Sequence, residues 1–119
     1  MPFRAILQKL VENVEGAVSA ILIEADGEAV QWFTVGDDEQ LRLRAAYVVI
    51  AAVSGRETLN KLGVKREKPI LMEYAGATFI VEELDKNYYL ILEILPTANV
   101  AIATYKFLPV AEQLRKEIA

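Results

Sequence analysis

Three arginines, Arg42, Arg44 and Arg56, lie at or near the ends of the most apolar segment of the chain, RAAYVVIAAVSGR at residues 44–56. An arginine that one protein inserts into the active site of another can stabilise the negative charge of phosphoryl transfer. A simpler interpretation is that these side chains keep the flanks of a very apolar helix in water. The three arginines are therefore candidate partner-docking residues, with solvation as the alternative.

Two groups of carboxylates are candidates for cation or acid–base sites. Glu24, Asp26 and Glu28 are closely spaced, but they lack the pattern of a calcium-binding loop, and an exposed hairpin tip explains them more simply. Glu82 and Glu83 are adjacent, so they cannot share one face of a strand. We interpret that pair as an exposed strand end and expect no metal site.

The chain lacks the side chains that most enzymes use. It has no histidine, no cysteine and only two serines, Ser19 and Ser54. This removes the usual general base, the common nucleophile pairs and most transition-metal sites. Neither glycine-rich nucleotide-binding motif occurs. We expect no cofactor and no catalysis by this chain alone.

The bulk composition predicts one domain over residues 1–119. The chain has 119 residues, 54% of them hydrophobic, and a net charge of −4, which gives no indication of nucleic-acid binding. The nine apolar residues at 45–53 are far short of the roughly 20 needed to cross a bilayer. The absence of cysteine favours a cytoplasmic protein. A basic segment, with Lys61, Lys65, Arg66 and Lys68, is expected to be a solvated loop.

The periodicity of apolar residues predicts helices and strands in the order α-β-β-α-β-β-β-α. The expected helices cover residues 3–14, 38–62 and 97 onward, and the strands 17–24, 28–35, 69–74, 77–84 and 88–95. Five strands joined mostly by hairpins indicate an antiparallel sheet. The first and last strands are apolar on both faces, which indicates helices on both sides of the sheet. The predicted fold class is α+β, with three layers.

Local signals set the ends of these elements. Gly16 stands where a helix C-terminal glycine belongs. The Asp26-Gly27 pair predicts a tight hairpin. Asp37 followed by Gln40 resembles a helix N-terminal capping box. Pro109 is expected to kink or restart the last helix, whose first half could also be a strand because it is rich in β-branched residues.

The central helix has two apolar stripes on opposite sides. One contains Leu41, Ala45, Val48, Ala52 and Leu59, and the other contains Leu43, Ala46, Tyr47, Ile50 and Val53. One stripe can pack on the sheet, and the sequence leaves open which one does so. The other stripe then needs a cover, because a helix that is apolar all round is a buried helix.

A second copy of the chain is the predicted cover. A two-fold dimer would place two copies of this helix against each other, and the strand after the helix could pair across the same axis and so protect a sheet edge. The residues assigned to this interface are Leu43, Ala46, Tyr47, Ile50, Val53, Ile70, Leu71, Met72 and Tyr74. The alternative is that the terminal helices cover both stripes within one chain.

With this order of elements, the chain resembles the roadblock family, which includes dynein light chains and prokaryotic regulators of Ras-like GTPases. The matching stretches are VEGAVSAILIEADGEAV, LRLRAAYVVIAAVSGRETLNKLG, ILMEYAGATFIVEELDKNYYLILEI and TANVAIATYKF. The resemblance implies a profilin-like α/β/α sandwich with strand order 2-1-5-4-3. It also implies dimerisation through the central helix and the following strand.

The resemblance favours one function among three. The leading hypothesis is a non-enzymatic homodimeric regulator or scaffold that binds a Ras-like small GTPase and could change its rate of GTP hydrolysis. The alternatives are a small-ligand sensor and a light-chain-like assembly adaptor. No nucleic acid and no membrane insertion are expected.

Overall fold

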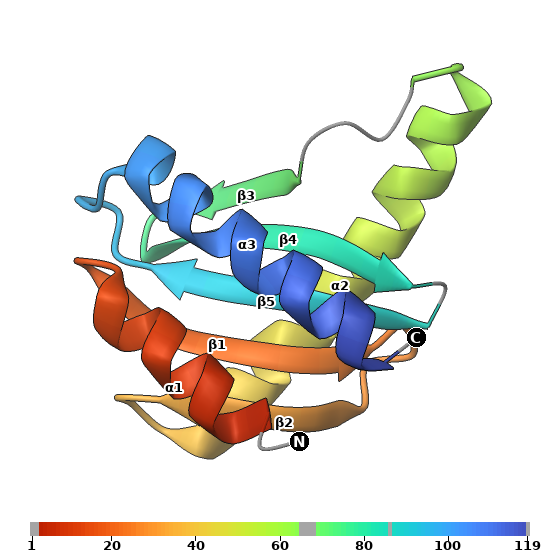
Figure 1. The fold of residues 1–119 in the computed structure, drawn as a ribbon. Helices are drawn as coiled ribbons and strands as arrows, with labels where there is room; N and C mark the ends of the chain where they lie inside the picture. The colour runs from red at the N-terminus through yellow and green to blue at the C-terminus, as the bar shows by residue number, and fades with distance from the viewer. Residues whose placement is uncertain (1–2, 65–68, 86, 119) are drawn as a thin grey trace.

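A computed structural model describes residues 3–64, 69–85 and 87–118 (Figure 1). Three helices and five strands follow one another in the predicted order. Their bounds are α1 Phe3–Asn13, β1 Ala17–Glu24, β2 Ala29–Thr34, α2 Asp38–Lys61, β3 Ile70–Tyr74, β4 Ala77–Asp85, β5 Tyr88–Ile94 and α3 Val100–Ile118. The predicted fold class is therefore confirmed.

The strands form one antiparallel sheet in the order β2-β1-β5-β4-β3. Two strands that are rich in buried residues, β1 and β5, lie side by side within it. The edges are β2 on one side and β3 on the other. This is the strand order that the resemblance implied.

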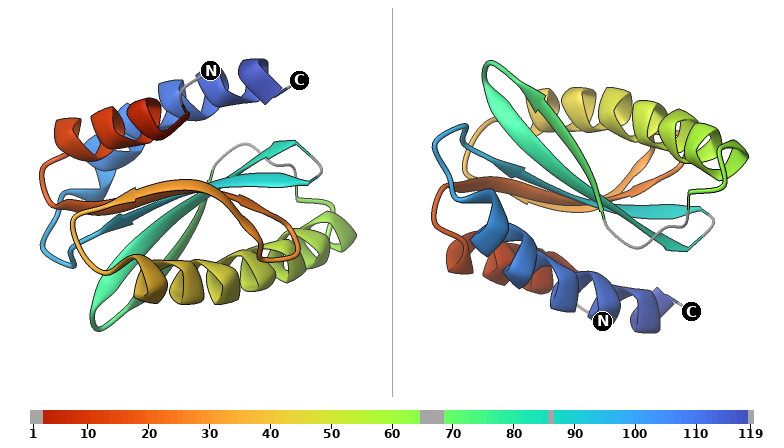
Figure 2. Two further views of the ribbon diagram at one scale, coloured as in Figure 1. Left: turned by 90° about the horizontal axis from the view of Figure 1, so that it is seen from below. Right: turned by 90° about the horizontal axis from the view of Figure 1, so that it is seen from above.

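The helices lie on both faces of the sheet. Figure 2 shows α1 and α3 together on one face and α2 alone on the other. Because side chains alternate along a strand, β1 sends Ala20 and Leu22 toward α1 and α3, and sends Ile21 and Ile23 toward α2. Two separate apolar clusters result, one on each face.

Two glycines turn the chain where an ordinary residue would be strained. Gly16 follows α1 with φ +86°, and a Cβ placed there would lie 2.7 Å from the Cβ of Ala98. Gly27 has φ +95° at the β1–β2 hairpin. Both positions match the predicted turns, because glycine adopts positive φ without steric penalty.

The caps of the two longer helices explain where each begins. The Asp37 carboxylate accepts a hydrogen bond of 2.9 Å from the backbone N–H of Gln40, as the capping pattern predicted. The Asn99 side chain accepts one of 3.0 Å from the N–H of Ile102. Since Asn99 supplies the cap, α3 starts at Val100 and not at Thr97.

The last helix is continuous through Pro109. The sequence indicates a kink or a restart there; the structure has no restart, and a kink stays a prediction. Buried contacts on both sides of the proline, at Phe107 and Ala111, hold the helix on the sheet. The same contacts explain why the first half of α3, although rich in β-branched residues, is helical: packing overrides a weak local propensity.

Within the described part of the chain, no helix has the length and apolarity to span a membrane.

Candidate functional site

One stripe of α2 packs on the sheet, which answers the question that the sequence left open. Its buried residues are Leu41, Ala45, Val49, Ala52 and Arg56. The stripe that was predicted around Leu41 and Ala52 is therefore the inner one. Within it, Val49 is fully buried, whereas Val48 and Leu59 are half-buried. The inner stripe thus runs along the line 41, 45, 49, 52 and 56.

The opposite side of α2 exposes large apolar side chains to solvent. Leu43, Tyr47 and Ile50 are 53%, 69% and 54% exposed. They follow one another at spacings of four and three, so they form a single stripe along the helix. Ala51 and Ser54 are small and also exposed beside this stripe. We call Leu43, Tyr47 and Ile50 the outer stripe.

Two residues that were assigned to the same interface lie deeper than the outer stripe. Val53 is half-buried and packs on the apolar cluster beneath α2. Ala46 is half-buried under the β1–β2 hairpin, where a Cβ added to Gly27 would lie 3.4 Å from the Cβ of Ala46. The α2 residues predicted for one interface therefore divide into an exposed stripe and two residues with intramolecular contacts.

The strand β3 is an edge of the sheet with apolar side chains on it. Ile70 and Met72 pack on the cluster beneath α2. Tyr74 is 52% exposed, and its ring stacks on Phe79 with centroids 5.8 Å apart. Leu71 is 48% exposed and pairs with Ile80, so it points to the α1/α3 side. All four predicted residues thus lie on an edge strand. Ile70, Met72 and Tyr74 are on the α2 side of the sheet, and Leu71 is on the α1/α3 side.

The three candidate arginines lie in three different surroundings. Arg42 is exposed, and its guanidinium carbon lies 5.0 Å from the centre of the Trp32 ring. Arg44 forms a 3.0 Å ion pair with Glu93. Arg56 is only 7% exposed, on the inner stripe. Arg42 is thus the most accessible of the three, while Arg44 and Arg56 contribute to packing α2 on the sheet.

The ion pair of Arg44 belongs to a polar network that the sequence analysis missed. Glu93 is 5% exposed, and its carboxylate accepts a 2.6 Å hydrogen bond from the Ser19 hydroxyl as well as the bond from Arg44. Buried charges require such partners. A signal was present in the sequence, because Glu93 is the one charged residue in the apolar run YYLILEIL.

The carboxylates near the first hairpin converge, as their spacing allows. Oxygens of Glu24, Asp26 and Glu28 lie within 4.8 Å of one another. The Asp26 carboxylate accepts a 3.1 Å hydrogen bond from the backbone N–H of Glu28, which is the geometry of a turn. This agrees with the interpretation of the group as a hairpin tip.

The interpretation of Glu82 as part of an exposed strand end is wrong. Its side chain is only 15% exposed and forms a 3.5 Å ion pair with Arg115 of α3. The Arg115 guanidinium also donates to the backbone carbonyls of Glu83 and Leu84, at 2.7 and 2.9 Å. Arg115 therefore connects α3 to the end of β4.

In the basic segment, Lys61 is exposed at the end of α2, and Lys65, Arg66 and Lys68 lie outside the described residues.

Comparison with known proteins identifies the fold. No family model and no curated protein matches the chain, but solved structures do. A roadblock/LC7 domain from Streptomyces avermitilis matches with a TM-score of 0.84 at 18% identity, covering 96% of this chain and 95% of that one.

Two structures of MglB are also similar. The gliding protein MglB from Thermus thermophilus matches with a TM-score of 0.81 at 20% identity, covering 97% of this chain and 88% of that one. An MglB structure described as having a tetrameric arrangement matches with a TM-score of 0.80 at 20% identity, over 94% of this chain and 84% of that one. At such identities the likeness concerns the fold. The chain has the fold of the roadblock family.

Proposed function

We propose that this protein is a non-enzymatic homodimer that acts as a regulator or scaffold for a Ras-like small GTPase in the cytoplasm. The roadblock fold and the likeness to the gliding protein MglB support a regulatory role. The GTPase partner follows from the family resemblance of the sequence.

The observation that carries the proposal is the outer stripe of α2. Leu43, Tyr47 and Ile50 are each more than half exposed, and they lie on the one helix that covers its face of the sheet alone among the described elements (Figure 2). Exposed apolar side chains arranged in a continuous stripe are typical of a protein–protein contact, whereas scattered ones are ordinary. A second copy would cover this stripe with an identical one.

The edge strand β3 extends the same surface. Within the described residues, its outer side has no neighbouring strand, and pairing with the β3 of a second copy would protect it. Small residues beside the outer stripe, Ala51 and Ser54, would let two α2 helices approach closely. The tetrameric arrangement of one MglB structure supports self-association in proteins of this fold.

The GTPase would dock on the surface that the paired helices create. Arg42 is the candidate contact, because it is exposed on α2 one residue from Leu43 of the outer stripe. Its guanidinium stacks on Trp32, which would hold it in place for a partner carboxylate or phosphate. Arg44 and Arg56 are not assigned to docking, since both face the sheet side of the helix.

A binding titration tests the proposal. The Ras-like GTPase encoded nearest to this gene would be loaded with a GTP analogue or with GDP and titrated with the protein by calorimetry, and its hydrolysis rate would be measured in parallel. We expect tighter binding of the GTP form and weaker binding of the variants Arg42→Ala and Tyr47→Arg. Lys116→Ala, on the opposite face of the sheet, is the control. Absence of binding to either form, with unchanged hydrolysis, contradicts the proposal.

A further inference from the structure

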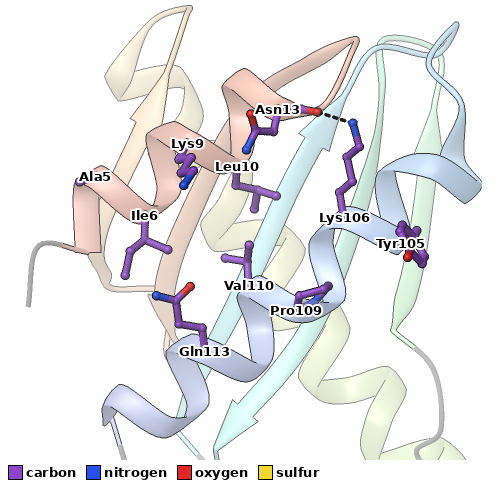
Figure 3. A pocket seen from close by; sticks show the side chains of 10 residues that line it. All are labelled: Ala5, Ile6, Lys9, Leu10, Asn13, Tyr105, Lys106, Pro109, Val110 and Gln113. Atoms are coloured by element: carbon purple, nitrogen blue, oxygen red, sulfur yellow. Dashed lines mark hydrogen bonds between the residues drawn. The ribbon is translucent and has the colours of Figure 1, made fainter.

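A second apolar surface lies on the opposite face of the molecule, between α1 and α3. Here the two helices border a groove of about 840 Å³. Figure 3 shows Ile6 and Leu10 of α1 and Val110 of α3 pointing toward one another across it. Pro109 and Tyr105 line the α3 wall. The groove is thus concave and mainly apolar, as peptide- and ligand-binding grooves are.

The charged groups of this groove are all positive. Among its ten lining residues, Lys9 and Lys106 are the charged ones. The ammonium group of Lys106 donates a 2.8 Å hydrogen bond to the backbone carbonyl of Asn13, which carries no net charge. Lys9 is exposed and forms no ion pair with the residues that the structure describes. Two cations therefore lie beside the apolar floor, and no anion among the lining residues balances them.

The surrounding helices share this positive bias. Together α1 and α3 carry five basic and three acidic residues, whereas the whole chain has 13 basic and 17 acidic residues. The ion pair between Glu112 and Arg115 cancels one charge of each sign, which leaves four basic and two acidic residues on the two helices. The basic character of the groove is therefore a local property of an acidic protein.

The outer side of α3 is apolar only along its first half. Ile102, Tyr105 and Leu108 are 52%, 79% and 41% exposed. In the second half, the exposed positions include Glu112 and Lys116. A solvated helix normally has polar residues on its outer face. The apolar exposure is thus confined to the half that contains Lys106.

We propose that the groove between α1 and α3 binds an amphipathic, acidic helix of a partner protein. The apolar side of such a helix would rest on Ile6, Leu10 and Val110, and its carboxylates would meet Lys9 and Lys106. Helices with apolar residues at spacings of three and four are a standard occupant of grooves of this kind. A groove-to-groove contact with a second copy of this chain is disfavoured, because the lysines of the two grooves would face one another.

This inference does not depend on the proposed dimer. The groove is lined by α1 and α3 and the outer stripe belongs to α2, and these helices lie on opposite faces of the sheet (Figure 2). A variant that disrupts one surface leaves the other intact. The two proposals can therefore fail separately.

Fluorescence anisotropy with the full chain tests the proposal. The probes are a pool of labelled helical peptides of about 16 residues, roughly 24 Å long, with leucines on one side and glutamates on the other. A matched pool replaces every glutamate by lysine. We expect members of the glutamate pool to bind about tenfold or more tighter than their lysine counterparts, and salt to weaken that binding.

Matched variants locate the binding. Lys9→Glu is expected to weaken the glutamate peptides by about threefold or more, and Gln113→Trp, which fills the groove, to weaken both pools. Lys116→Glu makes the same change of charge outside the groove and should leave binding within about twofold. Tyr47→Arg, on the opposite face, should leave it unchanged.

Three results would overturn the proposal. One is that no peptide of the glutamate pool binds. Another is that Lys9→Glu and Lys116→Glu weaken binding equally, which would indicate a general charge effect. A third is that vesicles of anionic phospholipid bind and lose binding in Lys9→Glu, whereas the glutamate peptides bind equally to Lys9→Glu and the unmodified protein, which would assign the groove to a membrane.

Discussion

The two faces of the sheet are covered in different ways. On one face, α1 and α3 each contribute one apolar stripe, and Phe107 and Leu114 of α3 are completely buried between helix and sheet. On the other face α2 lies alone, with a charged pair, Arg44 and Glu93, between helix and sheet. The first face is held by apolar packing of two helices, and the second by one helix with apolar packing and a buried polar network.

This difference is the structural basis for proposing a partner at α2. Two neighbouring helices shield the flanks that face each other, whereas a single helix has no helical neighbour on either flank. Both arrangements leave outer sides in water, and α3 also exposes apolar residues there, at Ile102, Tyr105 and Leu108. The outer stripe of Leu43, Tyr47 and Ile50 is therefore open in one chain. The α1/α3 pair leaves a different opening, the groove between the helices.

The largest effect on stability is expected on the face with two helices. Phe107 is fully buried, so Phe107→Ala should lower the free energy of unfolding by about 3–5 kcal/mol, since it leaves a cavity in the core. Urea denaturation measures this. Tyr105→Ala, two residues away and 79% exposed, should change it by less than about 0.5 kcal/mol. Equal losses in the two variants would show that α3 is not packed as described.

On the face with one helix, the polar network is expected to have the next largest effect. Arg44→Met leaves the Glu93 carboxylate buried, with the Ser19 hydroxyl as its remaining hydrogen-bond donor among those described. We expect a loss of about 1–3 kcal/mol in the free energy of unfolding, because a buried charge loses its partner. Glu93→Gln in the same background removes the buried charge and should restore at least half of the loss. If the double variant is no more stable than Arg44→Met in urea denaturation, the pair does not fix α2 as described.

The start of α2 is expected to make a smaller contribution. Asp37→Ala removes the cap on the N–H of Gln40 and should cost about 1 kcal/mol, measured by thermal unfolding. Asp38→Ala removes an adjacent carboxylate that is already inside the helix, so it should cost less than Asp37→Ala. The reverse order would mean that the charge near the helix end matters more than the capping bond.

The smallest effect on folding is expected at the outer stripe, where the effect on assembly should be greatest. Tyr47→Arg should change the stability of the monomer by less than about 0.5 kcal/mol, because the side chain is 69% exposed. We expect the same variant to dissociate the dimer. Tyr105→Arg makes the identical substitution on the opposite face and should leave the dimer intact, as judged by analytical ultracentrifugation. Dissociation by Tyr105→Arg alone would assign the interface to α3.

Much of the fold could be predicted from the sequence, because local signals and burial patterns agree. Glycines with positive φ stand at the predicted turns, and Asp37 caps the helix that its spacing with Gln40 indicated. The helix restart that Pro109 suggested is absent, because the sequence shows the lost hydrogen bond but not the packing of Phe107 and Ala111, which keeps the helix continuous.

The candidate site could be predicted only in part. The two stripes of α2 were separated only in outline, because the buried Val49 was in neither stripe and Ala46 and Val53 of the predicted outer stripe have intramolecular contacts. Which stripe faces the sheet depends on contacts between distant segments. Ala46 lies under the hairpin at Gly27, and Arg44 reaches Glu93, 49 positions away in the chain. The spacing of residues along one helix cannot predict such contacts between distant segments.

The central claim is that a second copy covers the outer stripe of α2, and the mass of the protein in solution tests it most directly. Light scattering coupled to gel filtration at micromolar concentration should give a dimer, twice the chain mass of 13.3 kDa, and Tyr47→Arg should give the single mass. A wild-type protein that remains at 13.3 kDa under these conditions would contradict the account.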